Sequence, residues 1–199
     1  MPSICIDPGH GGTDTGAVGN GLLESHTVLS IGLRLRELLR PHMDVVMTRD
    51  TDEFIPLKER CRIANDAGVD VYVSIHLNSA SNTSASGHEF FTSGTSQSRE
   101  LANAIGYRHA KAFPEQKNRG IKLGDNLYVL KHTRMPAALT EQAFLSNNAE
   151  CEFASKESTQ EGFAQAICDG VLDYFNIATT DQELTLEQRV VRIENHLGI

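Results

Sequence analysis

The sequence predicts an α/β domain whose helices cover a largely parallel sheet. Short apolar runs alternate with segments of helical periodicity, a pattern typical of α/β proteins. Residues 69–75 are almost continuously apolar, as expected of a central parallel strand that is buried on both faces. The run at residues 3–7 is also apolar, and it ends in the glycine-rich segment Pro8-Gly9-His10-Gly11-Gly12.

The remaining elements follow from periodicity and turn signals. Within residues 24–39, one stripe of a helix is apolar and is formed by Leu29, Leu33 and the pair Leu38-Leu39. Residues 57–67 form a second helix, which Gly68 closes as a carboxyl-terminal cap. Strands are expected at 3–7, 44–48, 69–75, 89–92, 127–130 and 137–140. Further helices are expected at 98–112 and, after a loop, at 157–175.

Length and composition indicate a soluble globular protein with one main domain. The chain has 199 residues, of which 40% are hydrophobic and 22% charged. No stretch approaches the roughly 20 apolar residues that a membrane span needs. Lysine and arginine number 18 against 26 aspartates and glutamates, which gives a net charge of −8. Because binding to a phosphate backbone depends on an excess of lysine and arginine, we expect neither a nucleic-acid partner nor a membrane span.

The last residues differ in character from the rest. We expect a catalytic domain over residues 1–176, then a short polar linker and an amphipathic helix within residues 177–199. Apolar residues in this helix recur at heptad spacing, at Leu186, Val190, Ile193 and Leu197. Two heptads are too short to be stable alone, so the helix either docks on the domain or pairs with a second copy in a homodimer. A mere linker remnant is the third interpretation.

The cysteines bear on where the protein is made. Cys5, Cys61, Cys151 and Cys168 are far apart in sequence, which excludes a zinc ribbon and a Cys-x-x-Cys redox pair. They are best interpreted as small buried hydrophobic residues, which suits synthesis in a reducing cytosol. No signal peptide is recognisable at the N-terminus, so either the chain is not exported by one or a signal peptide has been removed.

Four ionisable residues are candidates for a metal site. His10, His76 and Glu141 each follow an expected strand, and Glu24 begins an expected helix. Ligands of parallel α/β sheets collect beyond the carboxyl ends of the strands, so these side chains would converge. Two imidazoles and one carboxylate are a common ligand set for catalytic zinc. We therefore expect His10, His76 and Glu24 as ligands, and Glu141 as the base that takes a proton from water.

Simpler interpretations exist for each residue. A lone histidine after a strand is more often structural than a ligand, and we assign a structural role to the remaining histidines. Glu24 also fits an ordinary acidic residue in the first turn of a helix. Glu141 is harder to explain in this way, because burying a carboxylate without a partner is costly. The structural histidines are His26, His42, His88, His109, His132 and His196.

The ordered series of motifs resembles the zinc-dependent N-acetylmuramoyl-L-alanine amidases of the type 3 group, over about residues 3–176. The motifs span the chain from the first strand to the last. They are Asp7 to Gly12, Gly16, Gly21 and Glu24; Thr48-Arg49-Asp50, Leu57, Arg60 and Ala64-Asn65; Ser74 to Asn78; Gly87, Arg119-Gly120, Leu127 to Leu130, Pro136-Ala137 and Glu141; and Phe144 to Asn147.

The resemblance implies a mixed, mostly parallel sheet of about six strands covered by helices. It also implies that His10, Glu24 and His76 hold one Zn²⁺ per chain and that Glu141 is the catalytic glutamate. The substrate would be peptidoglycan, cut at the amide between N-acetylmuramic acid and L-alanine. One departure is the segment Thr140-Glu141-Gln142-Ala143, where the family more often has a small residue and glycine after the glutamate.

Further expectations concern substrate contacts and setting. We expect Asn78 and Arg119 to contact the substrate. Residues 87–141 are fully used by expected strands, one helix and a loop at Arg119-Gly120, which favours an open, unregulated site. The open site, the lack of a recognisable signal peptide and the free thiols together favour a phage-type lysin, made in the bacterial cytoplasm and acting on the wall after release. A secreted or periplasmic autolysin is the alternative. The alternative activities are a zinc peptidase or carboxypeptidase acting on the stem peptide, or a non-catalytic wall-binding domain.

Overall fold

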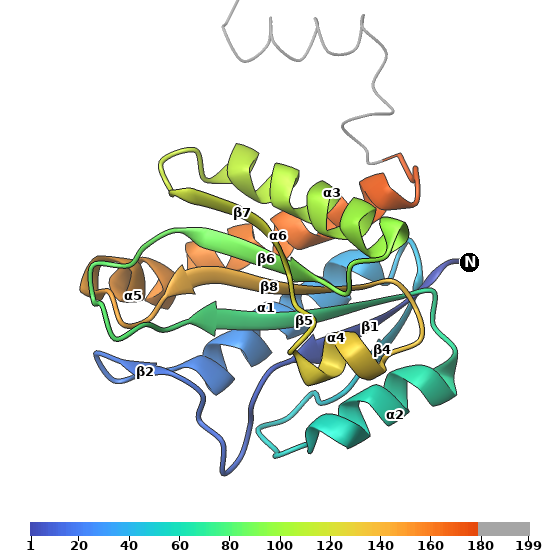
Figure 1. Cartoon of the computed structure of the whole chain (residues 1–199), viewed down its shortest axis with the longest axis horizontal. Helices are drawn as coiled ribbons and strands as arrows, with labels where there is room; N and C mark the ends of the chain where they lie inside the picture. The colour runs from blue at the N-terminus through green and yellow to red at the C-terminus, as the bar shows by residue number, and fades with distance from the viewer. Residues whose placement is uncertain (179–199) are drawn as a thin grey trace, which may run out of the picture.

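The computed structural model describes residues 1–178, which form an α/β domain around a six-stranded sheet (Figure 1). The strand order is β4-β1-β5-β8-β6-β7, and a separate two-stranded hairpin is formed by β2 and β3. The strands are β1 (Ser3–Pro8), β2 (Val18–Gly19), β3 (Leu22–Leu23), β4 (Asp44–Met47), β5 (Val71–Asn78), β6 (His88–Thr92), β7 (Asn118–Leu123) and β8 (Ala137–Phe144). The helices are α1 (Glu24–Leu39), α2 (Leu57–Ala67), α3 (Ser96–Ala112), α4 (Tyr128–His132), α5 (Asn148–Ser155) and α6 (Glu157–Tyr174).

The sheet is mixed and mostly parallel, as expected. β4, β1, β5 and β8 pair in parallel, β6 pairs antiparallel with β8, and the edge strand β7 pairs in parallel with β6. The expected helices at 24–39, 57–67, 98–112 and 157–175 are all present within a few residues. The alternation of short apolar runs and helical patterns therefore predicts most strands of the sheet and the helices that cover it.

Each face of the sheet has its own hydrophobic core. The larger core packs α1, α3 and α6 against one face, with Ile31, Ile105 and Phe163 fully buried in it. The smaller core packs α2 and α4 against the other face, around Tyr72 and Leu139. Figure 1 shows α2 and α4 in front of the sheet and α1 and α6 behind it. α2 and α4 cover only part of the front face, so the carboxyl ends of β5 and β8 stay uncovered there.

A buried ion pair lies beneath the glycine-rich loop that follows β1. Asp7 is buried, and its carboxylate accepts hydrogen bonds from Thr48, Tyr72 and Ser74 besides the Arg60 guanidinium at 2.8 Å. Burial alone would raise the pKa of Asp7, but Arg60 and the three hydroxyl donors lower it below its ordinary value. Asp7 is therefore held ionised in the interior of the domain.

Two buried arginines hold the same loop through its carbonyl groups. Arg60 donates to the carbonyl oxygens of Pro8 and His10. Arg49 donates to those of Pro8 and Gly9, and also to that of Ser25 in the first turn of α1. Because buried carbonyls need donors, the two guanidinium groups fix both the course of the loop and its position against α1.

Three sequence expectations for the secondary structure are wrong. The loop expected before residue 157 contains a helix, α5 (Asn148–Ser155). Residues 127–130 were expected to be a strand, but α4 (Tyr128–His132) is a short helix that packs beside α2 and buries Val129 and Leu130. Arg119 and Gly120 were expected in a loop, but they belong to β7. An apolar run of four residues does not distinguish a strand from a buried helical turn, and a polar edge strand lacks an apolar pattern.

The strands that carry the candidate site also run further than expected. β5 continues beyond His76 to Asn78, and β8 continues beyond Glu141 to Phe144. His76 and Glu141 therefore lie within strands rather than after them. The residues of the expected amphipathic helix, Leu186, Val190, Ile193 and Leu197, lie outside the described residues. Among residues 1–178, no helix is long and apolar enough to cross a membrane.

Replacing Arg60 with methionine tests the buried pair. The Arg60→Met variant keeps much of the side-chain volume but leaves Asp7 without its counter-ion, so we expect the free energy of unfolding to fall by about 3–5 kcal/mol. Chemical denaturation measures this change. Arg62→Met is the matched control on the same helix, because Arg62 is exposed and its ion pairs with Glu59 and Asp66 lie at the surface. Equal stability of the two variants would contradict a structural role for the pair.

Candidate metal centre

His10, Glu24 and His76 meet at one point, as the sequence predicts. One ligand atom from each lies within 4.8 Å of the other two. Glu24 Oε1 is 3.1 Å from His10 Nε2 and 3.0 Å from His76 Nδ1. The two imidazole rings stand nearly perpendicular, with centroids 4.9 Å apart. Two nitrogens and one carboxylate oxygen thus surround a common position, which is the donor set of many catalytic zinc sites.

Each of the three side chains comes from a different element. His10 lies in the loop after β1, with a positive φ of 59°. Glu24 is the first residue of α1, and its oxygens accept hydrogen bonds from the backbone N–H of Ala17 at 2.8 Å and of Leu77 at 3.0 Å. His76 lies within β5. Fixed backbone elements therefore hold the cluster before any ion binds.

Asp14 orients His10. Its Oδ2 atom lies 2.9 Å from His10 Nδ1, while its Oδ1 atom accepts a hydrogen bond from Gly16 N–H at 3.0 Å. With Nδ1 engaged by a carboxylate, the Nε2 atom of His10 is the nitrogen turned toward Glu24. A carboxylate behind a histidine in this way fixes the tautomer and strengthens the ring as a metal ligand.

The electrostatics of the cluster follow from these contacts. Burial alone would raise the pKa of Glu24, but the hydrogen bonds and charges of His10 and His76 lower it far below its ordinary value. Burial alone would lower the pKa of His10, but Glu24 and then Asp14 raise it. Glu24 is therefore ionised, as a carboxylate ligand must be.

Gly9 and Gly16 leave room for the two imidazoles. A Cβ atom on Gly9 would approach the His76 ring to 2.2 Å, and one on Gly16 would lie 2.6 Å from Glu24 Oε2 and 2.7 Å from His10 Cδ2. Gly16 also has a φ of +64°, which disfavours other residues. Because these close approaches exclude any side chain, the two glycines are part of the site.

Glu141 lies beside the cluster. It is the register neighbour of His76 across the parallel pair of β5 and β8, so the two side chains share one face of the sheet. Its Oε2 atom is buried and makes no hydrogen bond among the described residues. Burial, and next the charges of Glu24 and Glu89, raise the pKa of Glu141 well above its ordinary value. A buried carboxyl oxygen without a hydrogen-bond partner is typical of a group that binds a ligand or takes part in a reaction, rather than of one that stabilises the fold.

Asn78 and Arg119, the expected substrate contacts, meet at a residue that sequence reasoning missed. Glu89 accepts hydrogen bonds from Asn78 Nδ2 at 2.9 Å, from Arg119 Nε at 2.6 Å and from Lys122 Nζ at 2.5 Å. It is also the register neighbour of Glu141. The adjacent His88-Glu89 pair gives no signal of this role, because its cationic partners lie on β7, about 30 residues further along the chain.

Comparisons with known proteins give the family. Residues 4–173 match the family model described as N-acetylmuramoyl-L-alanine amidase. The chain belongs to this amidase family. It is similar to the N-acetylmuramoyl-L-alanine amidase LytC of Bacillus subtilis, with 37% identity over 87% of this chain and 35% of LytC. It is also similar to the endolysin of Bacillus phage SPP1, with 34% identity over 87% of this chain and 66% of the endolysin.

A solved structure extends the family comparison to the fold. The catalytic domain of the N-acetylmuramoyl-L-alanine amidase CwlV from Bacillus (Paenibacillus) polymyxa var. colistinus has a TM-score of 0.85 and 35% identity. The match covers 89% of this chain and all of that domain. The chain thus spans about a third of the length of LytC and about two thirds of the endolysin, but the whole of the CwlV domain.

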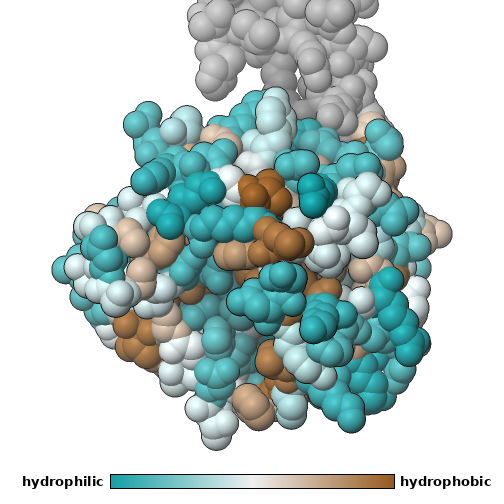
Figure 2. Space-filling view, in the orientation of Figure 1, coloured by the Kyte–Doolittle hydropathy of each residue, from teal (hydrophilic) through white to brown (hydrophobic). Residues whose placement is uncertain are grey.

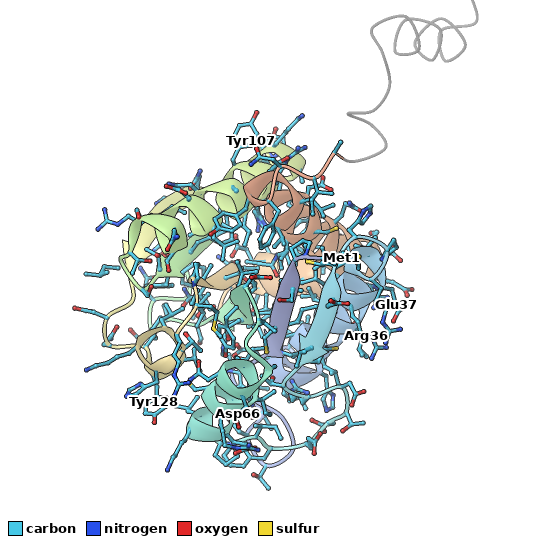
Figure 3. The ribbon with its side chains drawn as sticks, turned by 90° about the vertical axis from the view of Figure 1, so that its right-hand side faces the viewer. Met1, Arg36, Glu37, Asp66, Tyr107 and Tyr128 are labelled. Carbon is cyan, nitrogen blue, oxygen red and sulfur yellow. The ribbon has the colours of Figure 1, made fainter. Side chains whose placement is uncertain are left out.

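A groove leads to the cluster of His10, Glu24 and His76 between the N-terminal ends of α2 and α4. Its volume is about 420 Å³, and both His10 and His76 line it. Its outer walls are apolar, with Phe54 and Leu57 on one side and Tyr128 on the other. Figure 3 shows Tyr128 on α4 on the same side of the molecule as α2, which carries Asp66. On this face, Figure 2 shows small separate hydrophobic patches among hydrophilic residues.

The other described histidines lie away from the cluster. His88 and His109 are buried among aromatic rings, 4.3 Å apart between centroids. Burial, and next His88, lower the pKa of His109 to about 3, so its ring stays neutral. His26 contacts Asp52, and His132 stacks on Tyr128. These contacts agree with structural roles.

The Asp14→Asn variant tests the orientation of His10. Asparagine keeps the hydrogen bond to Gly16 but removes the carboxylate behind the imidazole, so we expect zinc affinity to fall about tenfold or more. Calorimetric titration of the metal-free protein with Zn²⁺ measures this. Asp52→Asn is the matched control, because Asp52 also binds the loop, through Gly12 N–H. Equal affinity losses in both variants would indicate a general effect on the loop and contradict the role of Asp14.

Proposed function

We propose that this chain hydrolyses the amide bond between N-acetylmuramic acid and L-alanine in peptidoglycan. The observation that carries the proposal is the meeting of His10, Glu24 and His76 beside Glu141 in a chain of the amidase family. LytC is named as an N-acetylmuramoyl-L-alanine amidase, and the similar phage protein as an endolysin.

The three clustered side chains fit one zinc ion per chain. Their donor set is two nitrogens and an ionised carboxylate oxygen, held by backbone N–H groups and by Asp14 before any ion binds. Gly9 and Gly16 keep the space beside the imidazoles free. When bound, zinc supplies Lewis-acid chemistry that polarises a carbonyl group and acidifies water.

Glu141 is the proton carrier in this proposal. Its carboxyl group would take a proton from the attacking water and donate it to the nitrogen of the leaving alanine. Its free Oε2 atom and its place next to His76 put it within reach of groups bound at the cluster. The side-chain amide of Asn78 donates one of its two hydrogens to Glu89, so the second can be donated to a carbonyl oxygen of the substrate.

The setting of the reaction is also proposed. The substrate class places the site of action at the bacterial cell wall. The four cysteines are free and buried, which agrees with synthesis in a reducing cytoplasm followed by release, as for a phage lysin. Export as an autolysin uses the same catalytic groups.

The Glu141→Gln variant tests the reaction. Glutamine keeps the shape of the side chain but cannot carry the proton, so hydrolysis of purified peptidoglycan should fall by about 10²–10⁴-fold while bound zinc stays at wild-type level. New α-amino groups and elemental analysis measure the two quantities. Glu161→Gln is the control, because Glu161 is exposed on α6, on the other side of the sheet.

The products separate the proposed activity from its alternatives. The wild type should release stems with N-terminal alanine. Other new N-termini would indicate a peptidase that cuts within the stem, and a wild type that binds walls without cutting them would indicate a binding domain. Wild-type rates in Glu141→Gln would contradict the role of Glu141.

A further inference from the structure

A row of polar side chains leads away from the metal cluster across the sheet. His76 on β5 neighbours Glu141 on β8, and Glu141 neighbours Glu89 on β6. Beyond Glu89, the pairing of β6 with β7 shifts register between His88 and Phe90, which gives β7 an extra residue at this level. Arg119 lies in this bulge. Bulges next to active sites often serve to aim a side chain, and here Arg119 is turned back toward Glu89.

The guanidinium of Arg119 is held in place and yet has free donors. Its Nε atom donates to Glu89, and its planar group lies 4.9 Å from the centre of the Phe144 ring. Its two terminal amino groups make no hydrogen bond to any described residue. A fixed guanidinium with two free amino groups is suited to bidentate binding of a carboxylate.

Lys122 provides a second cation at the same place. Its ammonium group donates a hydrogen bond, also to Glu89, and lies over the Phe91 ring. Arg119 and Lys122 therefore share the single carboxylate of Glu89. Glu150 is a second acidic group near Arg119, but its two carboxylate oxygens already accept hydrogen bonds from the backbone N–H groups of Gly87 and Phe144. The side chains of Arg119 and Lys122 stay 28% and 39% exposed, so a ligand from solvent can reach both.

We propose that Arg119 and Lys122 bind a carboxylate of the peptide stem and so direct the stem from Glu141 toward β7. This inference rests on the proposed amidase function. β7 lies two strand spacings from β8, about 10 Å. An extended peptide covers that distance in about three residues. The carboxylate is therefore one on the second or third residue of the stem, counted from the alanine at the scissile amide.

The hydrolysis test compares two substrates. One is an N-acetylmuramoyl tripeptide with free carboxylates on its second and third residues, and the other is the same molecule with both groups amidated. We expect wild-type kcat/KM to be about tenfold or more higher on the carboxylate form. Arg119→Gln and Lys122→Met should each raise KM on that form much more than on the amidated form, so that the preference of the wild type for the carboxylate is reduced. Glu89 keeps Asn78 and one cation in either variant, so the local fold is retained.

The control is Arg40→Gln, since Arg40 is exposed beyond α1 and pairs with Glu37. Figure 3 shows Glu37 and Arg36 projecting on the side of the molecule away from Tyr128. This variant should keep wild-type kinetics on both substrates. Equal losses on both substrates in Arg119→Gln would mean that Arg119 acts only through Glu89 and would overturn the inference. A wild type with no preference for the carboxylate form would overturn it as well.

A binding measurement keeps this inference separate from the reaction. Calorimetry of the inactive Glu141→Gln variant should give about tenfold tighter binding of the carboxylate tripeptide than of its amidated form. The double variant Glu141→Gln, Arg119→Gln should lose this difference. If the wild type cuts neither substrate while the difference in binding is present, the proposed function fails and the carboxylate site stands. Equal binding of both tripeptides would overturn the site even if hydrolysis occurs.

Discussion

The candidate site depends on the buried contact between Asp7 and the Arg60 guanidinium. Removing two charges from water is costly unless each is fully hydrogen-bonded, and here Asp7 has four donors. Arg60, which Asp7 holds in position, donates hydrogen bonds to carbonyl groups of the loop after β1. Arg49 donates to a carbonyl group of the same loop and to one in the first turn of α1. The loop carries His10 and α1 carries Glu24, so one polar network in the interior sets the distance between two candidate ligands.

Three acidic side chains and their positively charged or imidazole partners follow one another along the open face of the sheet. The acidic groups at Glu24, Glu141 and Glu89 lie on neighbouring elements, and each of the outer two is neutralised differently. Two imidazoles face Glu24, and two cations face Glu89. Glu141 lies between them, with a raised pKa and with one oxygen that has no hydrogen-bond partner within residues 1–178. In the proposed function, these three carboxylates of similar chemistry serve as a metal ligand, a proton carrier and an anchor for cations.

The sequence predicts the meeting of His10, Glu24 and His76 better than it predicts the surroundings of this cluster. His10, Glu24, His76 and Glu141 are identifiable for two reasons. Parallel strands bring their carboxyl ends to one edge of the sheet, and a buried carboxylate is costly unless a partner charge or a metal stabilises it. The helical form of residues 127–130 is set by packing against α2, which a four-residue apolar run does not reveal. β7 is held by pairing with β6 rather than by its own pattern, so the place of Arg119 and the role of Glu89 depend on contacts between distant segments.

The most direct test of the metal site is a crystal structure of the zinc-loaded protein with anomalous diffraction measured at the zinc absorption edge. We expect one anomalous peak in the domain, contacted by His10, Glu24 and His76, with Glu141 beside it and not among its ligands. A peak bound by other residues, or well-ordered side chains at these positions with no peak between them, would contradict it.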